Sequence, residues 1–238
     1  TVYYKDKPVQ QLNAEQSAFK IGFVQQNPDN QIVTDYVWHE LAFGLENMAL
    51  PVQDIRRRVS EMASFFGMEE WFHKKTCQLS GGQKQMLNLA AVMAMDPKLL
   101  ILDEPTSMLD PLAAANLLGM VRRINRELGV AVLICEHRLE EVYGLADRVV
   151  VLEEGRVVAD GEPRAVAGQL HCAVSPMALA LPVAARIAWG VEGRPGRRSG
   201  EGAPCDRPGR RSGEGAPCSN SIEVQGSLRV LALPNALQ

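Results

Sequence analysis

The chain is poor in several residue types, and each shortage excludes a class of protein. Aromatic residues make up only 5% of the 238 residues, which argues against a surface that stacks on nucleic-acid bases. The 25 basic and 28 acidic residues nearly cancel, so the net charge of −3 excludes a strongly basic nucleic-acid binder and a disordered polyanion. Five cysteines without metal-ligand spacing favour a reduced cytosolic chain.

Long apolar runs are also scarce. No charged-then-apolar signal segment follows Thr1, and the most apolar window covers residues 173–191. Pro176, Pro182 and Arg186 interrupt that window, so we expect a packed helix or a tail rather than a membrane span. The 46% of hydrophobic residues is nevertheless enough for a sizeable core.

The composition changes near residue 193, where glycine, proline and arginine take over. Residues 194–205 recur identically as residues 207–218, a repeat without an apolar face to bury. This pattern predicts a flexible linker. The alternative is that its six arginines contact anionic lipid or RNA, although three acidic residues dilute them.

Upstream of the linker, short apolar runs alternate with amphipathic segments. We expect strands at residues 19–24, 99–102 and 130–134, a hairpin from 149–152 and 156–159, and helices at 34–50, 54–67, 84–95, 111–128 and 138–146. Continuous apolar strands that alternate with helices predict an α/β fold with a mainly parallel sheet covered on both faces.

A glycine pair stands directly before one of the expected helices. Gly81 and Gly82 let backbone N–H groups approach a ligand, and the helix start adds partial positive charge. Ser80 and Gln83 add side-chain hydrogen-bonding groups. The segment therefore suits a phosphate group, and the alternative is an ordinary turn.

Further polar residues follow the buried strands. Asp103 and Glu104 end one strand, where an Asp can hold Mg²⁺ and a Glu can act as a general base. His137 follows the next strand and can donate to a γ-phosphate, whereas Gln26 follows the first and can reach the same Mg²⁺ or water. The alternatives are solvated acids, a structural histidine, a polar loop and, for Asp110, a helix N-cap.

The order and spacing of these residues resemble the nucleotide-binding subunit of ABC transporters. Gln26 matches the Q-loop, residues 79–83 the signature motif and residues 99–104 the Walker B motif. Residues 107–110 match the D-loop, and His137 matches the switch histidine.

The resemblance covers residues 2–163, and residues 27–31 and 42–44 are similar to the energy-coupling-factor group. That group takes up vitamins and transition-metal ions, so the implied function is an importer ATPase. The implied location is the cytoplasmic face of a bacterial or archaeal membrane. The implied fold is a RecA-like ABC-ATPase core with an inserted helical subdomain.

The resemblance also implies a mechanism. Two such subunits or domains sandwich ATP and Mg²⁺, and residues 27–68 dock a transmembrane coupling subunit; no nucleic acid is implied. The implied roles are Glu104 as base, Asp103 and Gln26 at Mg²⁺, His137 at the γ-phosphate, and Ser80, Gly81, Gly82, Gln83 and Asp110 at the nucleotide.

The resemblance divides the chain into six segments. They are residues 1–28, the end of the N-terminal ATPase lobe with the Q-loop; 29–96, a helical subdomain with the signature; 97–165, the catalytic core; 166–192, an apolar segment; 193–219, the linker; and 220–238, a tail that resembles the start of a second ATPase domain.

One family motif is missing. A phosphate-cradling loop needs Gly-Lys followed by Ser or Thr, and none of the seven lysines follows a glycine. We expect this Walker A motif upstream of Thr1, which would make the chain a fragment of an ATPase.

Two other functions stay open from the sequence. One is a soluble ABC protein that acts on DNA or ribosomes, although the 53 residues from Gln26 to Leu79 show no heptads of the kind found in chromosome-type members. The other is a nucleotide-independent interaction module, which the missing Walker A motif favours.

Overall fold

A six-stranded sheet forms the centre of the molecule. The computed structural model describes residues 20–153, 155–172 and 176–192, together with the short strands at 3–4, 7–8 and 228–232. In spatial order the sheet contains β3 (Ile21–Val24), β4 (Leu99–Asp103), β5 (Ala131–Glu136), β8 (Leu228–Ala232), β6 (Arg148–Glu153) and β7 (Arg156–Gly161). All neighbours are parallel except the β6–β7 hairpin, so the predicted α/β fold with a mainly parallel sheet is confirmed.

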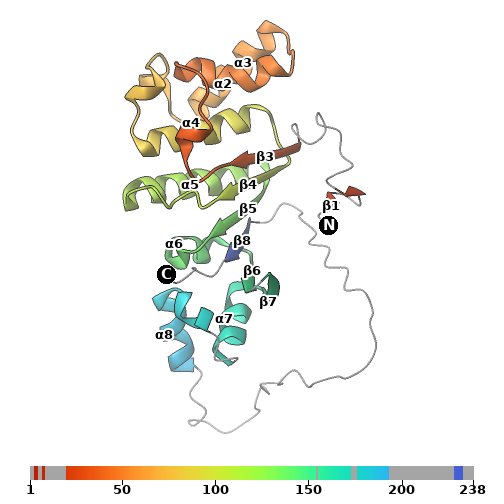
Figure 1. Cartoon of the computed structure of the whole chain (residues 1–238), viewed down its shortest axis with the longest axis vertical. Helices are drawn as coiled ribbons and strands as arrows, with labels where there is room; N and C mark the ends of the chain where they lie inside the picture. The colour runs from red at the N-terminus through yellow and green to blue at the C-terminus, as the bar shows by residue number, and fades with distance from the viewer. Residues whose placement is uncertain are drawn as a thin grey trace.

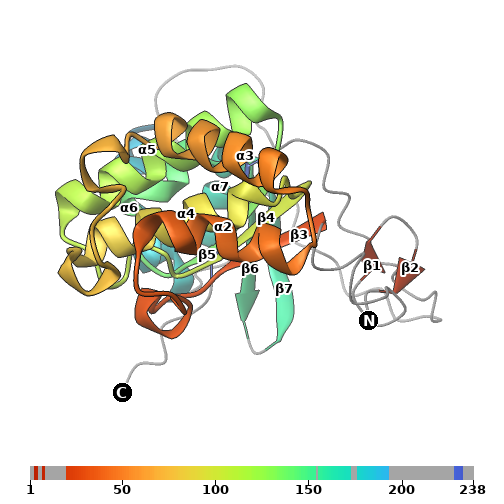
Figure 2. The same ribbon diagram turned by 90° about the horizontal axis from the view of Figure 1, so that it is seen from above.

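Helices pack around this sheet. They are α2 (Val37–Asn47), α3 (Val52–Phe65), α4 (Gly81–Ala94), α5 (Pro111–Leu128), α6 (Leu139–Val142), α7 (Pro163–Cys172) and α8 (Val183–Glu192). Short 3₁₀ turns cover Pro28–Asn30, Glu69–Trp71, Thr76–Gln78, Tyr143–Leu145 and Pro176–Ala180. Figure 1 shows α2, α3 and α4 gathered at one end of the molecule and α7 and α8 at the other. In Figure 2 the β6–β7 hairpin projects away from the helices. Apart from the sheet, β1 (Tyr3–Tyr4) and β2 (Lys7–Pro8) pair antiparallel with each other.

Local signals explain where two of the helices begin and end. Asp110 caps α5 by accepting a hydrogen bond from the Ala113 N–H at 2.9 Å, Pro111 occupies the first turn, and Gly129 ends the helix at φ 66°. The α5 bounds therefore match the prediction. Helix α4 begins three residues earlier than residue 84, because the side chains of Ser80 and Gln83 cap each other's backbone N–H groups.

The core lies between the sheet and the helices packed on it, and it takes in residues from α2 through to α7. Leu100 and Leu102 of β4 and Ile134 of β5 are fully buried. Helix α4 packs on β3 at Gly22, where an added Cβ would overlap Val92 Cγ1. Glycine is therefore required at this position, because any side chain would push the helix off the strand.

The described part of the apolar window, from residue 176 on, forms a 3₁₀ turn followed by α8. Leu181 is buried, and the N–H of Val183 donates to Glu140 Oε1 at 2.9 Å, which ties this segment to α6. Among the described residues, no helix has the length and apolar character needed to cross a membrane. The linker predicted at residues 193–219 lies outside the described residues.

One strand enters the sheet from far along the chain. Strands β5 and β6 follow each other in sequence, yet β8 lies between them and pairs parallel with both (Figure 1). The expectation that residues 220–238 begin a second ATPase domain stays a prediction. Part of that segment, residues 228–232, contributes to the sheet described here.

Candidate functional site

Three polar side chains meet at the carboxyl ends of adjacent strands. Gln26 Nε2 donates to Glu104 Oε2 at 2.9 Å, and His137 Nδ1 lies 3.4 Å from Glu104 Oε1. The three residues follow β3, β4 and β5, whose parallel pairing brings their carboxyl ends to one edge of the sheet. The structure therefore places Glu104 between an amide and an imidazole.

The same edge is negatively charged. Asp103 is the last residue of β4 and pairs in register with Cys135 of β5. Burial raises the pKa of the Cys135 thiol, and the nearby carboxylates of Asp103, Glu104 and Glu136 raise it further. The carboxylates, unlike the burial, would favour a cation at this edge.

The backbone at Glu104 has an unusual conformation for a residue with a side chain. Its φ of 41° lies in the left-handed region, which stores roughly 1–3 kcal/mol of strain in a non-glycine residue. Two contacts hold it there: the Glu104 N–H donates to Cys135 O at 2.9 Å, and Ser107 Oγ donates to Glu104 O at 2.9 Å. The turn thus directs the Glu104 carboxylate toward Gln26 and His137.

A buried carboxylate that we did not predict supports this turn. Glu136 is 0% exposed, and its Oε1 accepts hydrogen bonds from the Thr106 N–H at 3.1 Å and from Thr106 Oγ1 at 2.6 Å. Its Oε2 is buried without a hydrogen-bond partner in the part of the chain that the structure describes. An acidic residue at the end of an otherwise apolar strand was the available signal in the sequence.

Helix α4 holds the segment that carries Gln26. Gln85 Nε2 donates to Gln25 O at 3.0 Å, and Asn88 Nδ2 donates to Pro28 O at 3.2 Å. Both amides are buried, and Lys84 Nζ adds a contact of 2.6 Å with Asp29 Oδ1. We did not predict these contacts, although polar residues three apart in an apolar helix could have indicated them.

The sequence predicts the glycine pair directly before a helix, whereas the structure places both glycines in the first turn of α4. A side chain at Gly81 would meet no atom within 4 Å, whereas a Cβ at Gly82 would lie 2.9 Å from Ala113 Cβ. Gly82 therefore has a packing role within this chain, which the sequence did not indicate. Within the described ranges, no hydrogen bond joins residues 80–83 to Glu104, Gln26 or His137.

The loop before α5 presents apolar side chains to solvent. Asp110 serves as the N-cap of α5, the alternative that we considered for it. Met108 and Leu112 flank it and are 61% and 72% exposed. Such exposure beside a capped helix start leaves an apolar surface free for a contact.

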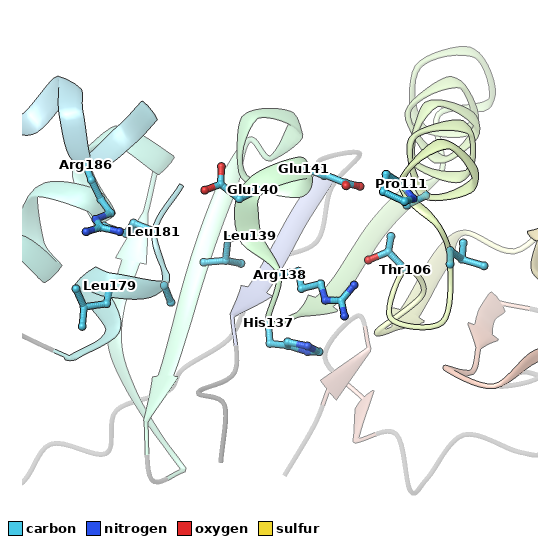
Figure 3. Close-up of a pocket in the computed structure, with 13 residues that line it drawn as sticks. Thr106, Pro111, His137, Arg138, Leu139, Glu140, Glu141, Leu179, Leu181 and Arg186 are labelled. Carbon is cyan, nitrogen blue, oxygen red and sulfur yellow. The ribbon is translucent and has the colours of Figure 1, made fainter. Parts of the chain in front are cut away.

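A pocket of about 390 Å³ opens beside His137 (Figure 3). It lies between the loop before α5, helix α6 and the turn before α8. Arg138 and Arg186 line it together with Glu140 and Glu141, so its charges are mixed. The pocket leaves open space on one side of the imidazole.

The donor set at Glu104 fits a magnesium ion only in part. Among the described residues, no group of three or more His, Cys, Asp or Glu side chains is arranged to hold a metal ion. Mg²⁺ commonly takes one or two protein carboxylates and completes its coordination with phosphate oxygens and water. The Asp103 carboxylate and the Gln26 amide suit that arrangement, provided that a nucleotide supplies the other ligands.

Sequence comparison identifies relatives of the chain. The ABC transporter family profile matches residues 1–107. A putative ABC transporter ATP-binding protein of Bacillus cereus is 51% identical over 164 residues, which are 69% of this chain and 30% of that protein. The energy-coupling factor transporter ATP-binding protein EcfA1 of Symbiobacterium thermophilum is 47% identical over 169 residues, which are 71% of this chain and 58% of that protein. The chain thus spans less than two thirds of the length of each of these relatives.

Two solved structures share the fold. CbiO1 of Clostridium perfringens, part of the ABC transporter complex CbiONQ, matches with a TM-score of 0.65 and 34% identity over 78% of this chain and 74% of that chain. The ATP-binding cassette MJ0796, solved as a dimer bound to ADP and Pi, matches with a TM-score of 0.57 at 24% identity, over 68% of this chain and 72% of that chain. These matches and the site geometry agree: the chain belongs to the ATP-binding subunits of ABC transporters and is close to the energy-coupling-factor ATPases.

Proposed function

We propose that the chain is the catalytic part of an ATP-hydrolysing subunit that powers an energy-coupling-factor importer of a vitamin or metal ion. The observation that carries the proposal is the position of Glu104, held between Gln26 and His137 at the end of parallel strands. The chain spans only part of the length of these relatives, so the activity is proposed for the ATPase subunit as a whole.

Glu104 acts as the general base. Its carboxylate accepts the proton of the attacking water, and the hydrogen bond from Gln26 fixes the orientation of the carboxylate. Asp103 and Gln26 would hold Mg²⁺, which would supply positive charge against the phosphates. Without a cation, the carboxylates at this edge would repel a triphosphate.

His137 contacts the γ-phosphate. Because one of its ring nitrogens faces Glu104, the position of the ring protons decides whether the other nitrogen can donate to that phosphate. A neutral imidazole has one N–H group, and Nδ1 faces the Glu104 carboxylate at 3.4 Å. If the proton lies on Nδ1, Nε2 is left as an acceptor and cannot donate to a phosphate oxygen. The imidazolium form donates on both sides and so satisfies Glu104 and the phosphate together.

A second subunit or domain completes the site. The N-terminus of α4, with Ser80, Gly81, Gly82 and Gln83, binds the nucleotide held by the partner, because N–H groups in the first turn of a helix attract phosphate. Asp110 lies at the same interface. The exposed Met108 and Leu112 beside it support a contact between subunits.

A transmembrane coupling subunit docks on the helical subdomain near residues 27–68. Trp38, Phe43 and Val52 of α2 and α3 are exposed, so this subdomain offers apolar side chains to a partner. The protein is therefore peripheral at the cytoplasmic face of a bacterial or archaeal membrane. The mixed surface charge gives no support for nucleic-acid binding.

The sequence contains no recognisable phosphate-binding loop. No Gly-Lys followed by Ser or Thr occurs among the 238. This observation favours a second function for the chain taken alone, namely a nucleotide-independent interaction module.

The test is ATP turnover of the longer subunit in complex with its membrane partner. Glu104→Gln keeps the shape and the hydrogen bond to Gln26 but removes the basicity of the side chain. We expect turnover to fall by about 10²–10⁴-fold while ATP binding is retained. Glu127→Gln, an exposed substitution on α5, is the matched control and should leave turnover unchanged. Equal turnover in Glu104→Gln and the parent protein would contradict the assignment.

A further inference from the structure

We propose that the sheet contains an acceptor slot for one parallel strand between β5 and β6, and that residues 228–232 of this chain fill it. The slot is a one-strand interruption in the middle of the sheet. Strand β5 ends at Glu136 and β6 begins at Arg148, so the two follow each other in the chain but do not pair.

The walls of the slot need a strand between them. Neighbouring strands lie about 4.8 Å apart, so β5 and β6 stand two strand spacings from each other and cannot satisfy each other's backbone groups. Residues Val132 and Ile134 of β5 and Val149 and Val151 of β6 are all fully buried. An empty slot would leave unpaired N–H and C=O groups in the centre of this apolar region, which is strongly unfavourable.

The pairing of β8 is continuous on both sides. Val230 is in register with Ile134 of β5 and with Val149 of β6, and both pairings are parallel (Figure 3 shows β8 between its neighbours). Four of the five residues of this strand, LRVLA, are apolar, as is typical of central strands in a parallel sheet, and Arg229 is the exception. The repeated segment at residues 194–218, rich in Gly, Pro and Arg, lacks such a run.

The slot also lies beside the proposed nucleotide site, and this part of the inference rests on the proposed function. Ala232 at the carboxyl end of β8 pairs with Glu136, the residue before His137. A loop that follows a strand in this slot therefore emerges beside Glu104 and His137. A strand that carried a phosphate-binding loop to that edge would have to displace residues 228–232, so the tail excludes such a strand while it is bound.

Hydrogen exchange of the whole chain tests the slot directly. In the parent chain, the amides of residues 229–232 should exchange at least about 10²-fold more slowly than an unstructured peptide of the same sequence, because central-strand amides open rarely. Exchange of these amides at the unstructured rate would overturn the proposal, and this result does not depend on any variant.

A proline substitution then empties the slot. Val230→Pro removes one backbone donor from a central strand, whereas Val230→Ile keeps it and serves as the matched control. We expect the β6 amides to lose protection in Val230→Pro but not in Val230→Ile. Equal protection in the two variants would overturn the proposal.

Binding of a labelled synthetic peptide of residues 226–234 tests whether the slot accepts a strand from a separate molecule. Fluorescence anisotropy should show binding to the Val230→Pro chain and none to the parent chain, whose slot is filled. Light scattering then shows whose strand fills the slot. A monomer supports filling by the same chain, whereas a dimer with protected amides at residues 229–232 would overturn the claim that each chain fills its own slot. None of these measurements involves nucleotide, so they can fail or succeed independently of the proposed ATPase function.

Discussion

Thr106 and Glu136 form a buried pair that holds the turn at Glu104 in place. Thr106→Val removes the hydroxyl that donates to Glu136 Oε1 at 2.6 Å and leaves the buried carboxylate with a single hydrogen bond. We expect a loss of about 1–3 kcal/mol in the free energy of unfolding, measured by urea denaturation. Thr106→Ser keeps the hydroxyl and is the control. Equal stability of the Val and Ser variants would show that this hydrogen bond contributes nothing.

Tyr143 provides a pH-dependent contribution to stability. Burial raises the pKa of Tyr143 to about 12, and its hydroxyl donates to Pro163 O at 2.6 Å. An unfolded tyrosine ionises near pH 10, so stability is fully present below about pH 10 and falls as the pH rises toward 12, by roughly 2–3 kcal/mol.

The check is a comparison of urea unfolding between pH 9 and pH 12 for the parent chain and Tyr143→Phe. The phenylalanine variant cannot ionise, so the stability difference between the two chains should change over this range. A difference that stays constant with pH would contradict the raised pKa.

At the level of secondary-structure elements, the N-cap of α5 lets us predict how replacing Asp110 changes the stability of the fold. Asp110→Ala removes the acceptor for the Ala113 N–H and should lower the free energy of unfolding by about 0.5–2 kcal/mol. Asp110→Asn keeps an acceptor oxygen and should unfold close to the parent temperature in calorimetry. If Asn is as destabilising as Ala, the negative charge matters beyond the cap.

The elements also show which parts of the fold can be predicted from sequence. Helix α5 is predictable to the residue because Asp110, Pro111 and Gly129 mark its ends locally. The start of α4 is not, because a Ser-Gly-Gly sequence is equally typical of a turn, and only the reciprocal hydrogen bonds between Ser80 and Gln83 show the cap.

In the candidate site, too, only the features with a local sequence signal can be predicted. Gln26, Glu104 and His137 are predictable as neighbours because each follows an apolar strand of a parallel sheet. Glu136 and Gln85 are not, because their partners Thr106 and Gln25 lie 30 and 60 positions away and no local pattern links them. The roles of the predicted site residues in catalysis stay predictions.

For the molecule as a whole, we expect the 238-residue chain alone to bind Mg-ATP weakly. A phosphate-binding loop supplies several charged-group hydrogen bonds of about 1.5–3 kcal/mol each. The absence of only three such bonds would lower the affinity by roughly three to six decades. Titration calorimetry is the measurement, and micromolar binding by a folded monomer would mean that other residues form a phosphate site.

The place of β8 in the sheet also bears on how the molecule acquires its structure during synthesis. Val132 lies 96 positions before its partner Leu228, so the middle of the sheet closes only after the residues on both of its sides have left the ribosome. Pairings of such long range form slowly, because loop-closure entropy has to be overcome before the contact is gained. Until then the growing chain exposes two unpaired inner strands, and such unpaired edges favour aggregation.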